Sequence, residues 1–149
     1  MLTKSKYAQI CKYTERPHSM SDRKAQALLD QWQLGSVLAV DCPSRVVLQH
    51  LTNRWGTLVM VALATGPHRF AELRRKVGGV SERMLSQTLK DLEGDGFVLR
   101  TAHAVVPPHV DYELTALGQQ AAAHVVALTG WIEGALPEIL AGQVKVAAE

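Results

Sequence analysis

Hydrophobic residues recur at three- and four-residue intervals near the middle of the chain, and the positions between them are polar or charged. The largely apolar stripe consists of Met84, Leu85, Thr88, Leu89 and Leu92. The opposite side of the segment carries Glu82, Arg83, Ser86, Gln87 and Lys90. This spacing predicts an amphipathic helix over residues 81–95. Ser81 is its expected N-cap, and Gly94 and Gly96 bracket its end.

The segments on either side of this helix predict a second helix before it and a β-hairpin after it. The earlier helix opens at Arg69–Phe70, turns Phe70, Leu73 and Val77 inward, and ends in a tight turn at Gly78–Gly79. Residues 97–101 and 110–114 are predicted strands. Pro107 and Pro108 stiffen the tip between them, because proline cannot sit inside a strand ladder. The order of elements predicts a mostly α (α+β) fold, a winged helix-turn-helix with the hairpin as its wing.

Two helices are predicted ahead of this unit. Asp41 is the expected N-cap of a helix that begins at Cys42–Pro43, where proline is tolerated in the first turn. Its expected buried side consists of Val46, Val47, Leu48 and Leu51. The next run, Trp55–Ala64, is almost uniformly apolar, and it is therefore the predicted central core helix.

After the wing, Thr115 is the predicted cap of a long helix that has apolar residues on several sides. No Lys, Arg, Asp or Glu occurs from Thr115 to Gly130. The main apolar series is Leu117, Ala121, Val125, Leu128, Ile132 and Leu136. Such a helix would expose a large apolar surface in a monomer, so we expect two subunits to share it. Pro137 is expected to interrupt it.

The chain is therefore divided into three regions. Residues 1–40 form an N-terminal extension with one predicted helix, Ser21–Leu34, and its role as an arm or as part of the dimer stays open. Residues 41–115 form the winged helix-turn-helix domain. Residues 116–149 form the dimerisation helix and tail.

Composition and charge add little to this picture. The chain has 149 residues and a formal charge of +2, which is too weak to argue for nucleic-acid binding on its own. We find no signal peptide and expect no apolar run of transmembrane length, so the predicted location is the cytoplasm, without a membrane partner. Two cysteines provide no disulfide framework for a chain of this size.

Motifs spread over most of the chain resemble one family, the HxlR-type transcriptional regulators, winged-helix proteins near the MarR group. The matching residues are Cys42-Pro43, Trp55, Gly66, Arg69-Phe70, Glu72-Leu73, Gly79 to Gln87, Leu89, Leu92-Glu93, Gly96, Val106 to Pro108, Val110 to Thr115, Gly118 and Trp131. The chain departs from the family where Asn53-Arg54 replaces Gly-Lys, and in its long N-terminal extension. The resemblance implies a homodimer that binds a double-stranded DNA operator.

The polar side of residues 81–95 suits base reading in a major groove. Arginine matches guanine and glutamine matches adenine, whereas lysine and serine reach phosphates, and a stiff wing tip can lie on the backbone or in the minor groove. The predicted DNA-binding residues are Ser81, Glu82, Arg83, Ser86, Gln87, Lys90, Arg69, Arg74, Arg75, His103 and His109. Each could equally be a solvated surface residue, and the group together favours DNA.

Cys42 is the predicted redox-sensing residue. A thiolate at a helix N-terminus is stabilised by the helix dipole, which makes the thiol reactive, although the neighbouring Asp41 opposes this. Some members of the resembled family sense oxidants or electrophiles at the cysteine of this Cys-Pro pair. Cys11 is a weaker candidate as the resolving partner. The alternative for Cys42 is a small apolar core residue, and the alternative input is a small-molecule effector.

Catalytic and metal-binding signatures are absent from the sequence. There is no Gly-x-Ser-x-Gly, phosphate loop, dinucleotide fingerprint, Cys-x-x-Cys or His-Glu-x-x-His, so we predict no enzyme, no cofactor and no metal site. Two other functions stay open. One is a winged-helix module that binds protein, and the other is a redox or ligand sensor whose output is not transcriptional.

Overall fold

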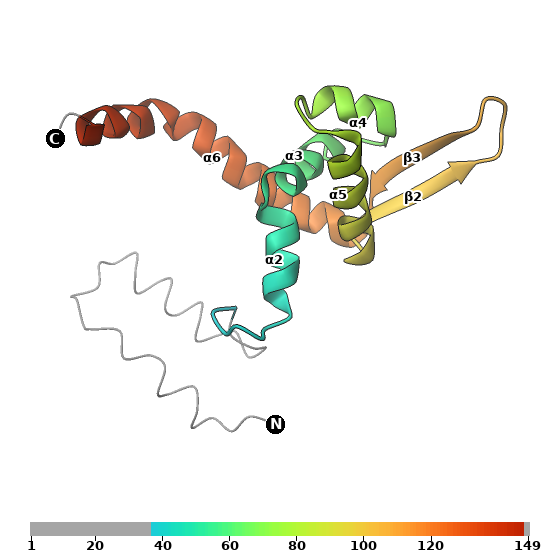
Figure 1. The fold of residues 1–149 in the computed structure, drawn as a ribbon, viewed down its shortest axis with the longest axis horizontal. Helices are drawn as coiled ribbons and strands as arrows, with labels where there is room; N and C mark the ends of the chain where they lie inside the picture. Colours follow the sequence, from blue (N-terminus) through green and yellow to red (C-terminus); the bar gives the residue numbers. More distant parts are fainter. Residues whose placement is uncertain (1–36, 148–149) are drawn as a thin grey trace, which may run out of the picture. The chain divides into compact units, whose positions relative to one another are not determined.

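A computed structural model describes residues 37–147 of the chain, which divides into two compact units, Met1–Cys42 and Pro43–Glu149. The predicted helix Ser21–Leu34 lies outside the described residues. In the first unit, a turn is closed by the Cys42 N–H, which donates to the Ala39 carbonyl at 3.2 Å. The second unit holds the helices and strands that follow (Figure 1).

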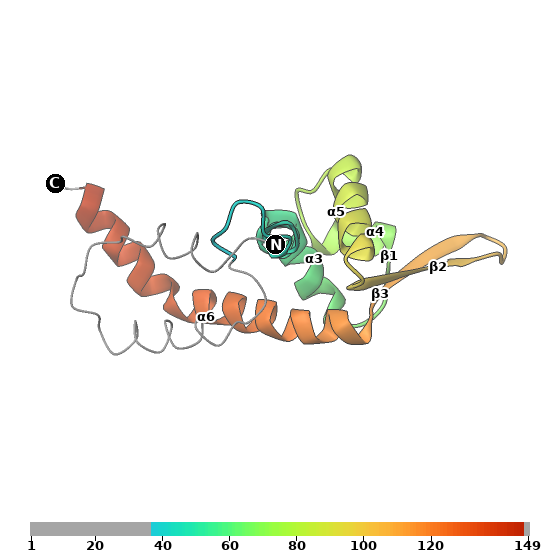
Figure 2. The ribbon, with the colours of Figure 1, turned by 90° about the horizontal axis from the view of Figure 1, so that it is seen from below.

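The second unit has the order of helices and strands of a winged helix-turn-helix. The predicted fold is therefore confirmed. The helices are α2 (Ser44–Thr52), α3 (Arg54–Leu63), α4 (Phe70–Lys76), α5 (Glu82–Gly94) and α6 (Ala116–Ala147). The strands are β1 (His68–Arg69), β2 (Val98–His103) and β3 (His109–Leu114). They form an antiparallel sheet in the order β1-β3-β2, and the β2–β3 hairpin projects beyond the helices (Figure 2).

Strand β1 was not predicted from the sequence. His68 pairs with Tyr112 and Arg69 with Asp111, so the segment that leads into α4 first adds a third strand to the wing sheet. A two-residue strand is too short to show an alternating pattern, and it forms because β3 offers it an edge. The Arg69 N–H then donates to the Glu72 carboxylate at 2.8 Å, which holds the start of α4.

The core lies where α3, α4 and α5 meet the base of the sheet and the first turns of α6. Helix α3 is central, as predicted, and Val59, Met60 and Leu63 are almost fully buried. The other helices and the sheet contribute Leu73, Val77, Val80, Leu85, Leu89, Leu92, Phe97, Val98, Ala122 and Val125. This core fixes α5 against α3 and against the base of the hairpin.

The prediction for α2 needs two corrections. Its N-cap is Pro43, without a side-chain cap, so Asp41 does not cap it. Val46 and Leu48 are 55% and 48% exposed, whereas Val47 and Leu51 pack against the core. Helix α2 lies at the edge of the unit, and one side of an edge helix cannot accommodate four apolar positions that spread around its circumference.

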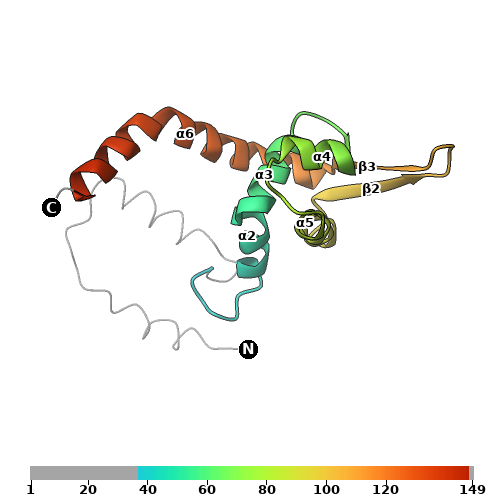
Figure 3. The same cartoon turned by 45° about the horizontal axis from the view of Figure 1, so that its top comes forward.

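Helix α5 begins as predicted, because the Ser81 hydroxyl accepts the Met84 N–H at 3.2 Å. Leu85, Thr88, Leu89 and Leu92 are buried, so the predicted stripe is confirmed at those positions. Met84 is 43% exposed, contrary to prediction, because it lies in the first turn at the margin of the stripe. Figure 3 looks nearly along α5 and shows the helix beside the base of the hairpin.

Thr115 joins the wing to α6 and caps that helix as predicted. Its hydroxyl donates to the Gly96 carbonyl at 2.6 Å and accepts the Gly118 N–H at 2.9 Å. The Thr115 N–H donates to the Phe97 carbonyl at 3.0 Å. A Cβ on Gly118 would lie 1.9 Å from the Phe97 carbonyl oxygen, so only glycine fits there. The end of α5, both long wing strands and α6 therefore meet in one tight junction.

Helix α6 corrects two further predictions. It continues through Pro137, because a proline removes one backbone hydrogen bond while the turns on either side stay intact. By length and composition alone, Ala116–Gln143 could also cross a membrane, although no such run was expected. The first turns of α6 instead pack on the core through Ala122 and Val125, and an apolar helix shared between two subunits has the same composition.

Candidate nucleic-acid interface

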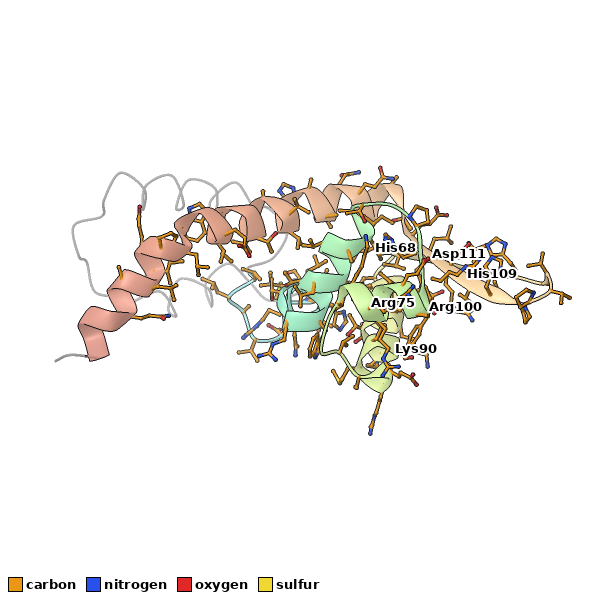
Figure 4. The ribbon with its side chains drawn as sticks, turned by 90° about the horizontal axis from the view of Figure 1, so that it is seen from above. His68, Arg75, Lys90, Arg100, His109 and Asp111 are labelled. Carbon is orange, nitrogen blue, oxygen red and sulfur yellow. The ribbon has the colours of Figure 1, made fainter. Side chains whose placement is uncertain are left out.

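An open groove of about 600 Å³ separates the polar side of α5 from the wing sheet. Its lining residues are Arg83, Ser86, Gln87, Leu89, Lys90, Glu93, Arg100 and Tyr112. Helix α5 thus turns four of its predicted DNA-binding residues toward a space that it shares with β2 and β3. Figure 4 shows Lys90 on α5 and Arg100 on the sheet.

Several basic side chains around α5 are unpaired. Arg75, Arg83, Lys90 and Arg100 are all exposed, and none of them makes an ion pair within residues 37–147. Their charges are therefore not neutralised by a neighbouring carboxylate. An exposed, uncompensated cation is the group that replaces counterions on a phosphate backbone. Arg100 was not among the predicted DNA-binding residues.

Two other predicted DNA-binding arginines are already engaged. Arg74 Nη1 donates to Glu82 Oε1 at 2.6 Å, so these two predicted residues contact one another. Arg69 Nε lies 3.8 Å from Asp111 Oδ1. Exposed pairs of this kind contribute about 0–1 kcal/mol, so a phosphate can compete for the arginine. Their positive charge is nevertheless largely balanced before any ligand arrives.

The remaining polar residues of α5 differ in what their side chains do. Ser81 caps the helix, so its hydroxyl already accepts a backbone N–H. Gln87 Nε2 donates to Asp91 Oδ1 at 2.8 Å, which orients the amide along the helix. Arg83 and Ser86 have no such intrahelical contact among the described residues, and both face the groove.

The two wing histidines form a cluster with Asp111, which was not a predicted site residue. His103 and His109 are register partners, and their rings stack with centroids 4.6 Å apart. Asp111 Oδ2 lies 2.9 Å from His103 Nε2 and 3.8 Å from His109 Nε2. The carboxylate makes this part of the wing less attractive to phosphate than two isolated histidines would be. The signal for Asp111 was the hairpin register, which places it two residues beyond His109 on the same face.

Tyr112 and Glu93 also line the groove without having been predicted as site residues. Neither has a motif that marks it in the sequence. Tyr112 comes from β3 and partly packs on the core, so it closes the sheet side of the groove. Glu93 adds a negative charge at the far end of α5, opposite to the end that carries Arg83.

Cys42 does not occupy the helix position predicted for it. Helix α2 begins at Ser44 with Pro43 as N-cap, so Cys42 precedes the cap and lies outside the first turn. Cys42 is half-buried and forms no disulfide among the described residues. The predicted partner, Cys11, lies outside them.

The chain resembles known proteins over most of this unit. The family model described as HxlR-like helix-turn-helix matches residues 50–139. The HTH-type transcriptional regulator YtfH of Escherichia coli (strain K12) is 57% identical over 115 residues, which cover 77% of this chain and 91% of the relative.

Solved structures agree with these sequence matches. The transcriptional regulator ytfH from Salmonella typhimurium is 57% identical, with a TM-score of 0.71, and the match covers 73% of this chain and 97% of that one. The redox regulator HypR in its oxidized form is 33% identical, with a TM-score of 0.58 and coverage of 62% and 96%. Diamide-treated YodB from B. subtilis is 30% identical, with a TM-score of 0.54 and coverage of 64% and 96%.

Proposed function

Because the chain belongs to the HxlR-like helix-turn-helix family of transcriptional regulators, which are not enzymes, we propose that it binds an operator in double-stranded DNA as a homodimer and reads the sequence with α5. The observation that carries this proposal is the groove between α5 and the wing sheet, with unpaired basic side chains on both sides. We further propose that the protein acts in the cytoplasm.

Base reading falls to the N-terminal half of α5. Arg83 and Gln87 are one helical turn apart on the exposed side, and Ser86 lies between them. Arg83 can bind guanine through two hydrogen bonds, and Gln87 can bind adenine once its amide leaves Asp91. Lys90, Arg75 and Arg100 are better placed to hold phosphates on either side, because they flank this surface and have no competing carboxylate.

Dimerisation through α6 is the second part of the proposal. Exposed apolar side chains follow one another along the helix: Leu128, Trp131, Ile132, Leu136, Ile139 and Leu140. Each such side chain gains about 1.5–3 kcal/mol when it leaves water, so a second copy of the same helix is the natural cover. A two-fold dimer presents two α5 helices about one DNA turn apart, which suits a roughly palindromic operator.

Regulation by oxidants at Cys42 is the third part. Among the similar structures, HypR is described as a redox regulator and YodB was solved after diamide treatment. Cys42 directly precedes the cap of α2, so a modification there would act on the start of that helix. A small-molecule effector is the alternative input.

The test is fluorescence anisotropy with the reduced full-length protein. The probe is duplex DNA from upstream of its own gene, with excess unrelated duplex as competitor, and each titration is repeated after mild oxidation. We expect nanomolar binding that survives the competitor, weakened in Arg83→Ala and unchanged in Glu133→Gln on α6. A change on oxidation that disappears in Cys42→Ser supports the redox input, and its persistence in that variant contradicts it.

Weak binding that is equal for every duplex, across a set of fragments from the same genome, would overturn operator reading, because it is only the electrostatic background. In that case a winged-helix module that binds protein becomes the better hypothesis for the function. Lack of any DNA binding in both redox forms would favour a sensor without a transcriptional output.

A further inference from the structure

The wing cluster of His103, His109 and Asp111 has a geometry that DNA binding does not require. One potential ligand atom from each residue lies within 4.8 Å of the other two, and all three side chains are half-buried. The cluster lies along the hairpin, beyond the groove beside α5, where Figure 4 labels His109 and Asp111. We propose that it is a binding site for a divalent transition-metal ion of the zinc type.

The hairpin register builds this site. His103 and His109 are directly opposite one another in the β2–β3 ladder. Asp111 lies two residues after His109, and residues at that spacing share a face of the sheet. Three side chains therefore converge from two paired strands, so the ordered backbone holds the ligand set together without a metal.

The distances fit a metal of this size. Asp111 Oδ2 lies 2.9 Å from His103 Nε2 and 3.8 Å from His109 Nε2. Ligand atoms that are bound to Zn²⁺ at about 2.0–2.1 Å in a tetrahedron lie about 3.3 Å from one another. The two observed separations bracket that value, and the ligand atoms of the third pair, the two histidines, lie within 4.8 Å of one another.

Neighbouring groups already orient two of the ligands. His109 Nδ1 lies 3.5 Å from the Pro107 carbonyl, which directs its Nε2 toward Asp111. Arg69 Nε lies 3.8 Å from Asp111 Oδ1, which leaves Oδ2 on the side of the histidines. Metal-binding histidines and carboxylates in proteins are commonly held by such outer contacts to carbonyls and charged side chains.

The ligand types narrow the choice of metal. Two imidazoles and one carboxylate suit Zn²⁺, Ni²⁺, Co²⁺ or Cu²⁺, whereas Mg²⁺ and Ca²⁺ prefer oxygen ligands. Three protein ligands leave a coordination position for water or for an outside donor. Without a metal and with neutral imidazoles the cluster carries one negative charge, and a divalent ion reverses this to one positive charge.

That reversal has a consequence that rests on the proposed DNA binding. A divalent ion would make this part of the wing more positive by two charges, so metal should tighten operator binding. The metal site itself is tested without DNA, so either proposal can fail alone.

The experiment is a titration of the metal-free, full-length Cys11→Ser/Cys42→Ser protein, in which thiolate ligands are removed. Co²⁺ is followed by its visible absorption bands, and Zn²⁺ by competition with a chromophoric chelator. We expect one ion per chain. His103→Gln and Asp111→Asn should each weaken Zn²⁺ binding by about tenfold or more, since even outer-shell partners contribute about 10–100-fold.

The matched control is His124→Gln, which removes an exposed histidine of α6 that is remote in sequence from the wing. This variant should bind Zn²⁺ as the parent does. Failure of the protein to compete with the chelator for Zn²⁺ at micromolar concentration would overturn the proposal. Equal loss in His103→Gln and His124→Gln would overturn it as well, because it indicates non-specific surface binding. Circular dichroism confirms that each variant is folded.

Discussion

Helices α5 and α6 both carry a regular apolar pattern, yet they bury very different parts of it. In α5, Leu85, Leu89 and Leu92 are each at most 2% exposed, and the outward side is polar. In α6, Ala122 and Val125 are buried among the described side chains, while Leu128 and Trp131 are 50% and 65% exposed. The apolar side of α5 is therefore buried within a single chain, whereas much of the apolar surface of α6 stays exposed.

This difference in burial indicates that the two helices have different roles. Helix α5 is fixed by its own core, so its polar side can be presented to a ligand without help from another subunit. Helix α6 leaves water in contact with apolar surface that a partner could cover. The four predictions that follow test this contrast, starting with the largest expected effect.

The double substitution Leu128→Glu/Ile132→Glu should break the proposed dimer. These residues lie one turn apart on the exposed side of α6, so both charges would be buried at the interface in each subunit. Sedimentation at micromolar concentration should show monomer. Operator affinity should fall by at least about a hundredfold. That loss is as large as the one caused by about two mismatched base pairs in a binding site. Glu133→Gln is the control, and a double variant that still sediments as a dimer would place the interface elsewhere.

Leu85→Ala should destabilise the chain by about 2–5 kcal/mol, because it leaves a cavity in the core beneath α5. Met84→Ala is the neighbouring control, and its effect should stay below about 1 kcal/mol because that side chain is 43% exposed. Urea denaturation measures both. Equal losses at the two positions would mean that α5 packs on both sides.

Arg83→Ala should lower operator affinity by about 1–3 kcal/mol per half-site and relax the preference at one base pair of each half-site. Lys90→Ala should instead weaken binding to all sequences alike, because its proposed contact is a phosphate. Anisotropy with a set of single-base operator variants distinguishes the two patterns. An unchanged preference in Arg83→Ala would remove this residue from base reading.

The smallest effect concerns two adjacent arginines. Arg75→Ala should lower the slope of log affinity against log salt by about one unit per subunit, since it removes one unpaired cation from each half of the proposed dimer. The double variant Arg74→Gln/Glu82→Gln should leave the slope almost unchanged, because it removes an ion pair with no net charge. Binding measured across a salt series tests both. A drop in slope for the double variant alone would indicate that Arg74, and not Arg75, contacts phosphate.

Much of the fold could be predicted from local patterns. The burial of Leu85, Leu89 and Leu92 follows from helical spacing, and the cap at Ser81 follows from its hydroxyl. Predictions failed where a position depends on the rest of the molecule. Val46 and Leu48 fit an apolar stripe, but α2 is an edge helix with too little core to cover them. Strand β1 exists because β3 lies beside it.

The candidate site shows the same limit. Helix spacing is enough to place Arg83 and Gln87 on an exposed side of α5. It cannot reveal that Arg74 contacts Glu82, or that His103 meets Asp111 across a hairpin. These contacts depend on strand register and on the angle between helices, which are set by packing. Only the known fold therefore shows which basic side chains already contact a carboxylate and which are free of such an ion pair.

The junction at Thr115 limits which insertions and deletions the gene can tolerate. The Thr115 hydroxyl forms hydrogen bonds with the backbone of both Gly96 and Gly118, and the backbone oxygen of Phe97 leaves no space for a side chain at Gly118. One residue added just after this junction would rotate the rest of α6 by about 100° about its axis. The apolar side would then face a new direction relative to the wing. A length change at the hairpin tip would leave the direction of α6 unchanged.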